Sequence, residues 1–291
     1  MYSRVLLVGM RCEFSRIVLE ALLTAHIPVV GMIIPPHRSY TAAFLQLNSN
    51  ANLLPLWPAD VVNVAHAAQV PVWEVNRLRA PETLAWFEAL QPEVLACACF
   101  PRRLPQEWLA RLKVGGLNLH PALLPAYRGP APLFWQFRNG EVKTGVTLHV
   151  LEERLDTGPI VAQAAVPLTD GVSEAEAERL MAYSGAQLLI QALKQAEWPR
   201  RPQPTVGVSY APHPTDEDLV IPTQWPARRA FNFARGAEER GPLMIDMGVQ
   251  RLVVKRALSF AEDVTLNADP QTSHNVIQVR FNPGRVSFQR A

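Results

Sequence analysis

The sequence predicts an α/β protein in which an open, mostly parallel sheet is followed by a small β-rich C-terminal domain. Short apolar runs alternate with helical patterns over residues 1–198, and this alternation is typical of βαβ units. A Pro-rich segment at 199–204 predicts a linker, because its prolines forbid a helix. Residues 205–291 hold short strand-like runs, which predict a separate OB-like domain.

Composition indicates a globular chain without a strong electrostatic preference for one class of partner. Of 291 residues, 48% are hydrophobic and 19% charged, so a sizeable core can form. The net charge of +2 gives no global basic field for nucleic acid. No run approaches the about 20 apolar residues of a membrane span, and the first apolar run is too short for a signal peptide. We therefore expect a protein that is not associated with a membrane.

The cysteines point to a reducing compartment. Cys12, Cys97 and Cys99 lack a metal-ligand pattern and cannot all pair with one another, which favours the cytoplasm and predicts no metal site. Cys97 and Cys99 lie in an apolar run, so we expect both to be buried thiols.

The first half of the chain predicts alternating strands and helices. The apolar run at 4–10, the helical pattern at 13–25 and the apolar run at 27–34 form a βαβ unit of a Rossmann-like sheet. The turn after the first strand is GMRCEF and lacks the GxGxxG pattern, so a dinucleotide site is not expected. A polar irregular loop is expected at 35–52. Further helices are expected at 59–68, 80–90 and 104–113, and further strands at 70–75, 93–100 and 114–119.

The second half continues this pattern and then changes. Prolines after residue 120 predict a stiff loop through Pro132. Strands at 145–150 and 160–166 and a helix at 173–196 complete the first domain. Past the linker we expect a short helix at 227–234 among strands at 220–221, 243–245, 251–254, 275–279 and 286–288.

Polar residues at strand ends form the candidate site. Asn118 and His120 are two positions apart at the end of the strand at 114–119, so their side chains point the same way. Asp156 precedes Gly158, which permits a tight turn. An Asn, a His and an Asp on neighbouring loops can build an acyl-transfer site, although each alone could be a turn amide, a packed ring or a loop cap. His149, within a strand, is interpreted as a packing residue.

These residues lie in motifs that resemble those of formyltransferases using 10-formyltetrahydrofolate. The motifs are Asn118-Leu119-His120-Pro121, Leu123-Leu124-Pro125, Arg128-Gly129, Ala131-Pro132, Thr144-Gly145-Val146-Thr147 and Leu155-Asp156-Thr157-Gly158. The resemblance is strongest over about residues 90–170 and implies the formyltransferase fold. It also implies that an acceptor amine attacks the formyl carbon of the folate.

The resemblance assigns a role to each group of candidate residues. Asn118 and His120 would donate hydrogen bonds to the tetrahedral oxyanion, and Asp156 would orient His120 or a water and assist proton transfer. The expected folate contacts are Phe100, Arg102, Arg103, Leu104, Leu151, Glu152 and Leu155. The expected acceptor contacts are Arg11, Arg38, Pro121, Leu124, Arg128 and Gly129.

The acceptor stays open at this point. The family includes an enzyme that formylates methionyl-tRNA, which we favour, enzymes that formylate amino sugars on nucleotides or other small amines, and a hydrolase; a non-catalytic folate-binding protein is a further alternative. The tRNA enzyme has a basic Gly-Arg-Gly-Lys-like loop, where this chain has only His37 and Arg38. The arginine pair 228–229 and the basic pair 255–256 could contact phosphates or form a solvated face. The sequence does not indicate an oligomeric state.

Overall fold

The computed structural model describes residues 4–37, 40–47, 60–248, 250–263 and 270–290, and it divides into two compact units. Unit 1 contains Met1–Arg128, Gly145–Val166 and Arg179–Ser209. Unit 2 contains Gly129–Thr144, Pro167–Glu178 and Tyr210–Ala291. Because the units alternate along the chain, they do not share a single boundary, and the division into domains at 198–205 stays a prediction.

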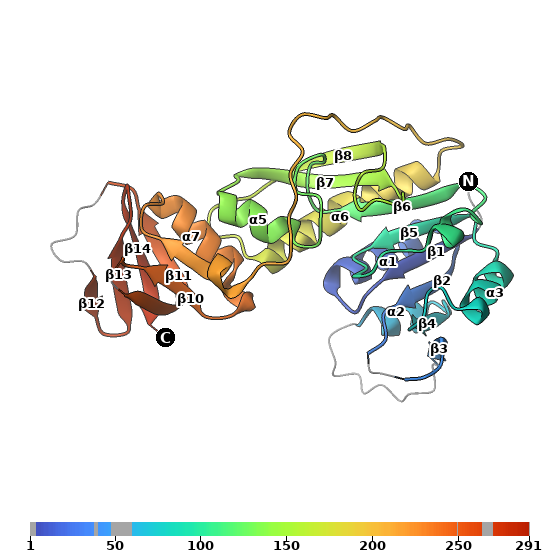
Figure 1. Ribbon diagram of the computed structural model, residues 1–291, viewed down its shortest axis with the longest axis horizontal. Coiled ribbons are helices and arrows are strands. Elements are labelled where there is room, and N and C mark those ends of the chain that lie inside the picture. Colours follow the sequence, from blue (N-terminus) through green and yellow to red (C-terminus); the bar gives the residue numbers. More distant parts are fainter. Residues whose placement is uncertain (1–3, 38–39, 48–59, 249, 264–269, 291) are drawn as a thin grey trace. The chain divides into compact units, whose positions relative to one another are not determined.

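The open, mostly parallel sheet that the sequence predicted is present in unit 1; it has eight strands in the order β3-β4-β2-β1-β5-β6-β7-β8 (Figure 1). The strands are β1 (Val5–Gly9), β2 (Val29–Ile34), β3 (Phe44–Leu47), β4 (Val72–Val75), β5 (Val94–Ala98), β6 (Gly115–His120), β7 (Lys143–Val150) and β8 (Ile160–Pro167). Strands β4, β2, β1, β5 and β6 are parallel, whereas β3 and β7 run antiparallel to β4 and β6. The strand order reverses between β1 and β5, which is where open α/β sheets bind ligands at their carboxyl edge.

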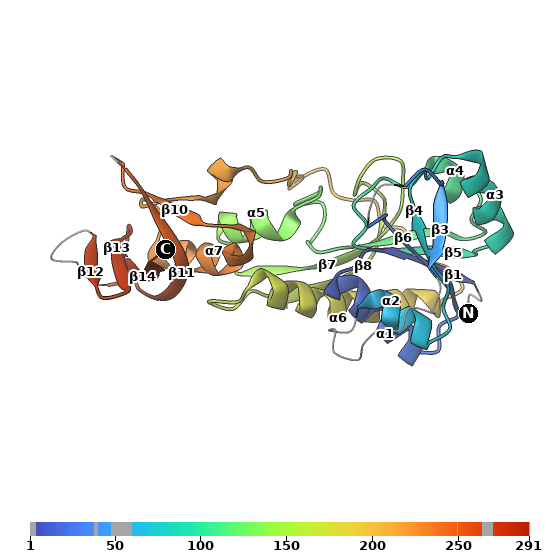
Figure 2. The same cartoon turned by 90° about the horizontal axis from the view of Figure 1, so that it is seen from below.

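Helices cover both faces of this sheet (Figure 2). One face carries α3 (Pro81–Leu90) and α4 (Gln106–Leu109); the other carries α1 (Glu13–Thr24), α2 (Val61–Ala67) and α6 (Glu174–Leu193). Strand residues alternate between the two faces. Leu6 and Val8 therefore share a core cluster with Phe87 of α3 and Trp108 of α4. Burial on both faces explains why β1 and β5 are continuous apolar runs.

Unit 2 combines a second sheet with two helices. Its order is β12-β13-β14-β11-β10-β9, and all neighbouring strands are antiparallel except β9 and β10. The strands are β9 (Val220–Pro222), β10 (Leu243–Asp246), β11 (Arg251–Ala261), β12 (Gln271–Ser273), β13 (Val276–Arg280) and β14 (Arg285–Arg290). Helix α7 (Ala227–Gly236) packs on β11 and β14, and it meets α5 (Pro132–Asn139) through Phe233 and Phe134, whose rings lie 5.5 Å apart.

Several local predictions were wrong. The loop predicted after residue 120 is present up to Ala131, but helix α5, which begins at Pro132 because proline fits the first turn of a helix, was not predicted. The loop predicted at 35–52 contains β3, which adds an edge strand to β4. Cys99 is exposed rather than buried, because it follows the end of β5 and has a left-handed φ of 63°. The strand predicted at 251–254 extends to Ala261 because it pairs with β14.

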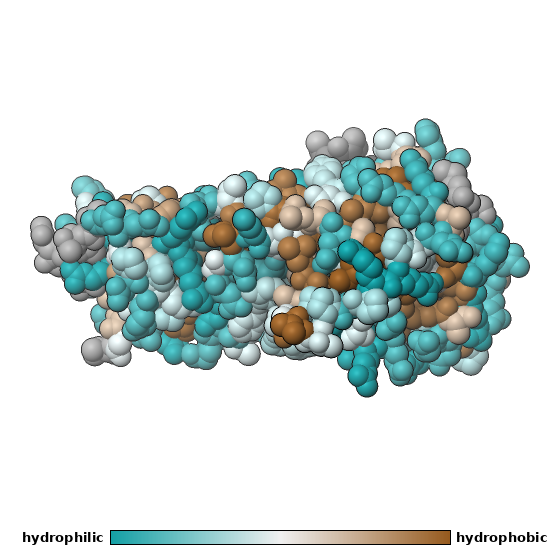
Figure 3. Space-filling model, turned by 90° about the horizontal axis from the view of Figure 1, so that it is seen from above, coloured by the Kyte–Doolittle hydropathy of each residue, from teal (hydrophilic) through white to brown (hydrophobic). Residues whose placement is uncertain are grey.

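The surface is largely hydrophilic on the face that Figure 3 shows, with smaller groups of apolar side chains among the polar ones. Most large apolar residues of the described chain are buried in the two cores. Within those described ranges, no helix combines the length and the hydropathy that crossing a membrane requires.

Candidate active site

The predicted site begins at the carboxyl end of β6, which lies between β5 and β7 in the sheet of unit 1. Asn118 pairs in register with His149 of the antiparallel strand β7. His120, the last residue of β6, is buried, with 4% of its surface exposed. Sheet pairing on both sides of β6 therefore fixes the backbone from which Asn118 and His120 project.

Asp156 reaches the same place from the loop between β7 and β8. Its φ of 55° is left-handed, and its side chain is buried against the end of β6. A Cβ at Gly158 would lie 1.9 Å from the carbonyl oxygen of Val150, so only glycine permits this close approach to β7. The glycine that follows Asp156 thus allows the loop to bring the carboxylate to the ends of the strands.

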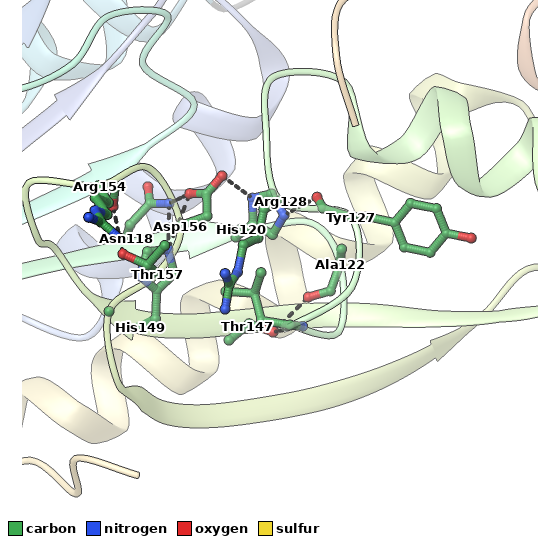
Figure 4. Close-up of polar contacts among 12 residues, drawn as sticks. Asn118, His120, Ala122, Tyr127, Arg128, Thr147, His149, Arg154, Asp156 and Thr157 are labelled. Carbon is green, nitrogen blue, oxygen red and sulfur yellow. Dashed lines mark hydrogen bonds and ion pairs between the residues drawn. The ribbon is translucent and has the colours of Figure 1, made fainter. Parts of the chain in front are cut away.

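The three predicted catalytic side chains converge in the structure (Figure 4). Asp156 Oδ2 lies 3.6 Å from His120 Nδ1, and Asp156 Oδ1 lies 3.5 Å from Asn118 Nδ2. Asp156 Oδ1 is also 3.5 Å from His149 Nε2. One carboxylate therefore contacts an amide and two imidazoles, in a site that is largely shielded from water.

The hydrogen bonds of His120 define where a proton can move. Its Nε2 lies 2.8 Å from the carbonyl oxygen of Tyr127, which can only accept, so Nε2 carries hydrogen and Nδ1 faces Asp156. Burial lowers the pKa of His120, while the Asp156 carboxylate opposes that shift. A neutral ring would direct the lone pair of Nδ1 at a carboxylate. A proton between Nδ1 and Asp156 Oδ2 removes this repulsion, and the pair is thus arranged to hold and release one proton.

His149 is a site residue that sequence reasoning missed. Its Nδ1 donates to the carbonyl oxygen of Val150 at 2.9 Å, so its Nε2 is the acceptor for Asn118 Nδ2 at 3.0 Å. The sequence interpretation of a packed ring is correct for its burial but omits this contact. The antiparallel register of the strands at 114–119 and 145–150 would have placed His149 beside Asn118, and that register is not visible in the sequence alone.

The amide of Asn118 consequently has one committed and one available N–H. The bond to His149 is of ordinary length, whereas the 3.5 Å contact with Asp156 is long for a hydrogen bond. A bound ligand can therefore replace Asp156 at the second N–H without loss of a strong bond.

Residues of the predicted linker hold the loop that carries Asp156. Gln203 Nε2 donates to the carbonyl oxygens of Asp156 and Gly158, both at 2.8 Å. Gln203 Oε1 accepts two hydrogen bonds from Arg128, at 3.1 Å from Nε and 2.6 Å from Nη2. Arg201 pairs with Ile160 of β8. The Pro-rich segment therefore supports the site, besides joining parts of the chain.

The residues predicted to contact folate lie in two segments of unit 1. Phe100, Leu104 and Leu151 pack at the edge of the core cluster formed by β1, β5, α3 and α4. Arg102 donates to the carbonyl oxygens of Val75 and Asn76, both at 2.8 Å, so its guanidinium fixes the loop after β5. The remaining three side chains are exposed: Arg103, Glu152 and Leu155.

Most of the described residues predicted to contact the acceptor lie in the segment between β6 and α5. Arg11 forms ion pairs with Asp60 and Glu74, and Leu124 is buried, with its N–H bonded to Thr147 Oγ1 at 3.0 Å. Pro121 is half-buried, Arg128 bonds to Gln203 as described above, and Gly129 belongs to unit 2. Arg38 lies outside the described residues. Contacts of these residues with an acceptor stay predictions.

The site can combine stabilisation of an oxyanion with transfer of one proton. It offers an amide N–H from Asn118 and a buried His120–Asp156 pair. Within the described residues, no group of three or more His, Cys, Asp or Glu side chains is placed to hold a metal ion.

Comparison with known proteins identifies relatives of the same architecture. Residues 50–193 match the model of a family described as formyl transferase. A methionyl-tRNA formyltransferase of Synechococcus sp. (strain JA-3-3Ab) is 35% identical over 229 residues, which are 77% of this chain and 68% of the relative. That of Pelotomaculum thermopropionicum is 37% identical over 182 residues, or 62% of this chain and 58% of the relative.

Solved structures show the same fold over nearly the whole chain. An N-formyltransferase from Helicobacter canadensis, in complex with folinic acid and dTDP-3-aminofucose, superposes with a TM-score of 0.67 at 15% identity, covering 100% of this chain and 99% of that one. Methionyl-tRNA formyltransferase from Clostridium thermocellum gives 0.58 at 13% identity, covering 99% and 100%.

Proposed function

Because this chain belongs to the formyl transferase family, we propose that it transfers the formyl group of 10-formyltetrahydrofolate to the α-amine of methionyl-tRNA. The relatives that support this acceptor are named methionyl-tRNA formyltransferases and share 35–37% identity with the chain. The observation that supports the chemistry is the position of the Asp156 carboxylate, which lies 3.6 Å from His120 Nδ1 and 3.5 Å from Asn118 Nδ2. Attack of an amine on a formyl group gives a tetrahedral intermediate. Its formation requires a hydrogen-bond donor for the oxyanion and a group that accepts and returns a proton.

The second N–H of Asn118, which makes only a long contact with Asp156, stabilises the tetrahedral intermediate. When the amine attacks the formyl carbon, negative charge develops on the formyl oxygen. The Asn118 amide is held by His149, so its second N–H is oriented before the reaction begins. A preoriented donor of this kind contributes about 3–4 kcal/mol to stabilisation of the transition state. His120 was expected from the sequence to be a second oxyanion donor. Its Nε2–H is instead bonded to the carbonyl oxygen of Tyr127, so it is not the oxyanion donor in this arrangement.

The His120–Asp156 pair moves the proton. Attack makes the acceptor nitrogen positively charged, and the nitrogen must lose a proton before the C–N10 bond breaks. The pair accepts that proton between Nδ1 and Oδ2 and returns it to N10 of the leaving tetrahydrofolate. One proton is taken up and one is released, so no covalent enzyme intermediate is required.

A nucleotide-linked amino sugar is the second candidate acceptor. The arginine pair considered for phosphate contacts is engaged within unit 2: Arg228 bonds to Asp170 at 2.8 Å, and Arg229 bonds to the carbonyl oxygen of Arg138 and lies 3.9 Å from the ring centre of Trp225. Such internal contacts favour a structural role for the pair. A smaller acceptor would need fewer phosphate contacts than a tRNA.

The acceptor is tested by supplying each amine with the same donor. Purified protein is given 10-formyltetrahydrofolate together with methionyl-tRNA, with methionyl-tRNA whose α-amine is acetylated, with amino sugars linked to nucleotides, or with no acceptor. Formylated methionyl-tRNA and no product from the acetylated control are expected. Formylation of an amino sugar alone would replace the proposed acceptor, and tetrahydrofolate release without any acceptor would indicate a hydrolase.

A further inference from the structure

Two cysteines meet at the carboxyl edge of the sheet, where the strand order reverses. Cys12 lies in the turn after β1, and Cys99 directly follows β5, the parallel neighbour of β1. Gly9 and Ala98, the last residues of these strands, are paired in register. Cys12 Sγ lies 3.5 Å from Ser15 Oγ, which is itself 2.7 Å from the carbonyl oxygen of Ala98, so the Cys12 thiol lies beside the residue that precedes Cys99. Neither cysteine is used in the proposed formyl transfer.

Ser15 fixes the two turns relative to each other. Its Oγ donates to the carbonyl oxygen of Ala98 at 2.7 Å and accepts from the N–H of Met10 at 3.0 Å. One buried hydroxyl therefore ties the turn that carries Cys12 to the residue before Cys99. The proximity of the two thiols is a property of this connected backbone and does not depend on long, flexible side chains.

Cys12 occupies a position that stabilises a thiolate. It is the N-cap of the 12-residue helix α1, and its sulfur accepts from the N–H of Ser15 at 3.5 Å. The hydrogen bond from Cys99 is the largest cause that lowers the pKa of Cys12 to about 6, while burial opposes this shift. At pH 7 a thiol of that pKa is mostly ionised, whereas an ordinary cysteine is mostly protonated.

The charged neighbours of Cys12 are engaged in other contacts. Arg11 pairs with Asp60, and Glu13 pairs with two arginine side chains. The groups that lower the pKa of Cys12 are therefore the thiol of Cys99, the Ser15 side chain and the backbone N–H groups of Ser15 and Phe14.

Cys97 provides an internal contrast two residues before Cys99. It is buried in the core of unit 1, and burial raises its pKa to about 12. Cys12 is partly exposed and Cys99 is exposed, so reagents can reach these two and not Cys97. A buried protonated thiol is unreactive, which restricts chemistry to the facing pair.

We propose that Cys12 and Cys99 are a redox-sensitive pair that forms a disulfide with low-molecular-weight disulfides such as oxidised glutathione. The Cys12 thiolate attacks one sulfur of the oxidant, forms a mixed disulfide and releases one molecule of thiol. Cys99 loses its proton to solvent and attacks the Cys12 sulfur, which releases the second thiol molecule. Two protein thiols are oxidised, and one small disulfide is reduced to two thiols.

The location gives this modification a consequence for the neighbouring segment. Cys99 precedes Phe100, the first of the residues predicted to contact folate, so the disulfide would join the turn after β1 to that segment. Such a link would restrain residues at the edge where open α/β sheets bind their ligands.

The pair is tested by equilibration of the full chain with mixtures of reduced and oxidised glutathione, followed by acid quenching, alkylation and peptide mapping without reduction. A peptide that links Cys12 to Cys99 is expected in the wild type. The Cys99→Ala variant should instead accumulate glutathione on Cys12. A wild type that stays reduced across the mixtures, or that retains glutathione on Cys12, would overturn the proposal.

Two controls separate chemistry from misfolding. Cys97→Ala should form the same linked peptide, because this buried thiol takes no part; loss of the link in a folded Cys97→Ala protein would contradict the assignment. The pH midpoint of Cys12 alkylation should lie near 6 in the wild type and move upward in Cys99→Ala. An unchanged midpoint would show that the two thiols do not interact.

Discussion

Replacement of His149 by Phe keeps a ring in a buried position but removes both ring nitrogens. The change deprives Asn118 of its acceptor at 3.0 Å and leaves the carbonyl oxygen of Val150 without its bond at 2.9 Å from Nδ1. An unsatisfied buried polar group costs about 1–3 kcal/mol. Of the two groups, the carbonyl oxygen of Val150 is expected to stay unsatisfied, because the Asn118 amide can turn toward Asp156 or solvent. The free energy of unfolding should fall by about that amount.

The same change should slow catalysis more than it weakens binding. An Asn118 amide that turns away from its oriented position loses the oxyanion donor, which is worth about 3–4 kcal/mol, or a factor of about 10²–10³ in kcat. The KM for 10-formyltetrahydrofolate should change little, because the bond forms only in the transition state. Steady-state kinetics and urea unfolding of the same preparations measure the two effects separately.

A matched control uses another histidine of unit 1. His66 of α2 has its Nε2 3.1 Å from the carbonyl oxygen of Leu47, remote in sequence from the site strands. His66→Phe should lower stability without a selective loss of kcat. If His149→Phe retains full kcat, or loses no more activity than His66→Phe, the positioning of Asn118 by His149 is wrong. The double variant with Asn118→Ala should lose little beyond Asn118→Ala alone.

Three further outcomes follow from other contacts. Gly158→Ala places a Cβ against the carbonyl oxygen of Val150, so unfolding free energy should fall by about 1–3 kcal/mol and kcat should drop, measured by urea denaturation and kinetics. Arg102→Ala removes two bonds to backbone carbonyls and should cost about 1.5–3 kcal/mol in the same denaturation assay; an unchanged unfolding midpoint would contradict their contribution. Burial lowers the pKa of His120 below its ordinary value of 6.5, so the unfolded chain binds more protons below that pH, and stability should fall with acidification. The free energy of unfolding of His120→Gln should fall less between pH 7 and 5 than that of the wild type. Parallel stability curves for the two proteins would refute His120 as the origin of this pH dependence.

The sheet of unit 1 was largely predictable because its signals are local. Continuous apolar runs such as 4–10 and 93–100 predicted strands buried on both faces, and the structure places β1 and β5 there. The pair Asn118 and His120 was predictable for the same reason, since the period of two sets their direction. Asp156 was found through the glycine that follows and through the resemblance of the surrounding motif.

The remaining features depend on contacts between distant segments. His149 acquires its role from the register between β6 and β7, and Gln203 from a bond to the loop of Asp156. Cys99 lies in an apolar run that predicted burial, but the strand ends one residue earlier and turns. Pro132 was interpreted as part of a stiff loop, although the same residue type also begins helices. The contacts of His149 and Gln203 have no signature in one local stretch of sequence, whereas the proline that begins α5 is a local signal that was interpreted as part of a loop.

The most direct measurement of the proposed chemistry is single-turnover formyl transfer by Asp156→Asn with 10-formyltetrahydrofolate and methionyl-tRNA at saturating concentration. The asparagine keeps the size of the side chain but cannot share a proton with His120 Nδ1. The transfer step is expected to slow by a factor of about 10²–10⁴ while folate binding is retained. A transfer rate equal to that of the wild type would contradict proton transfer through the His120–Asp156 pair.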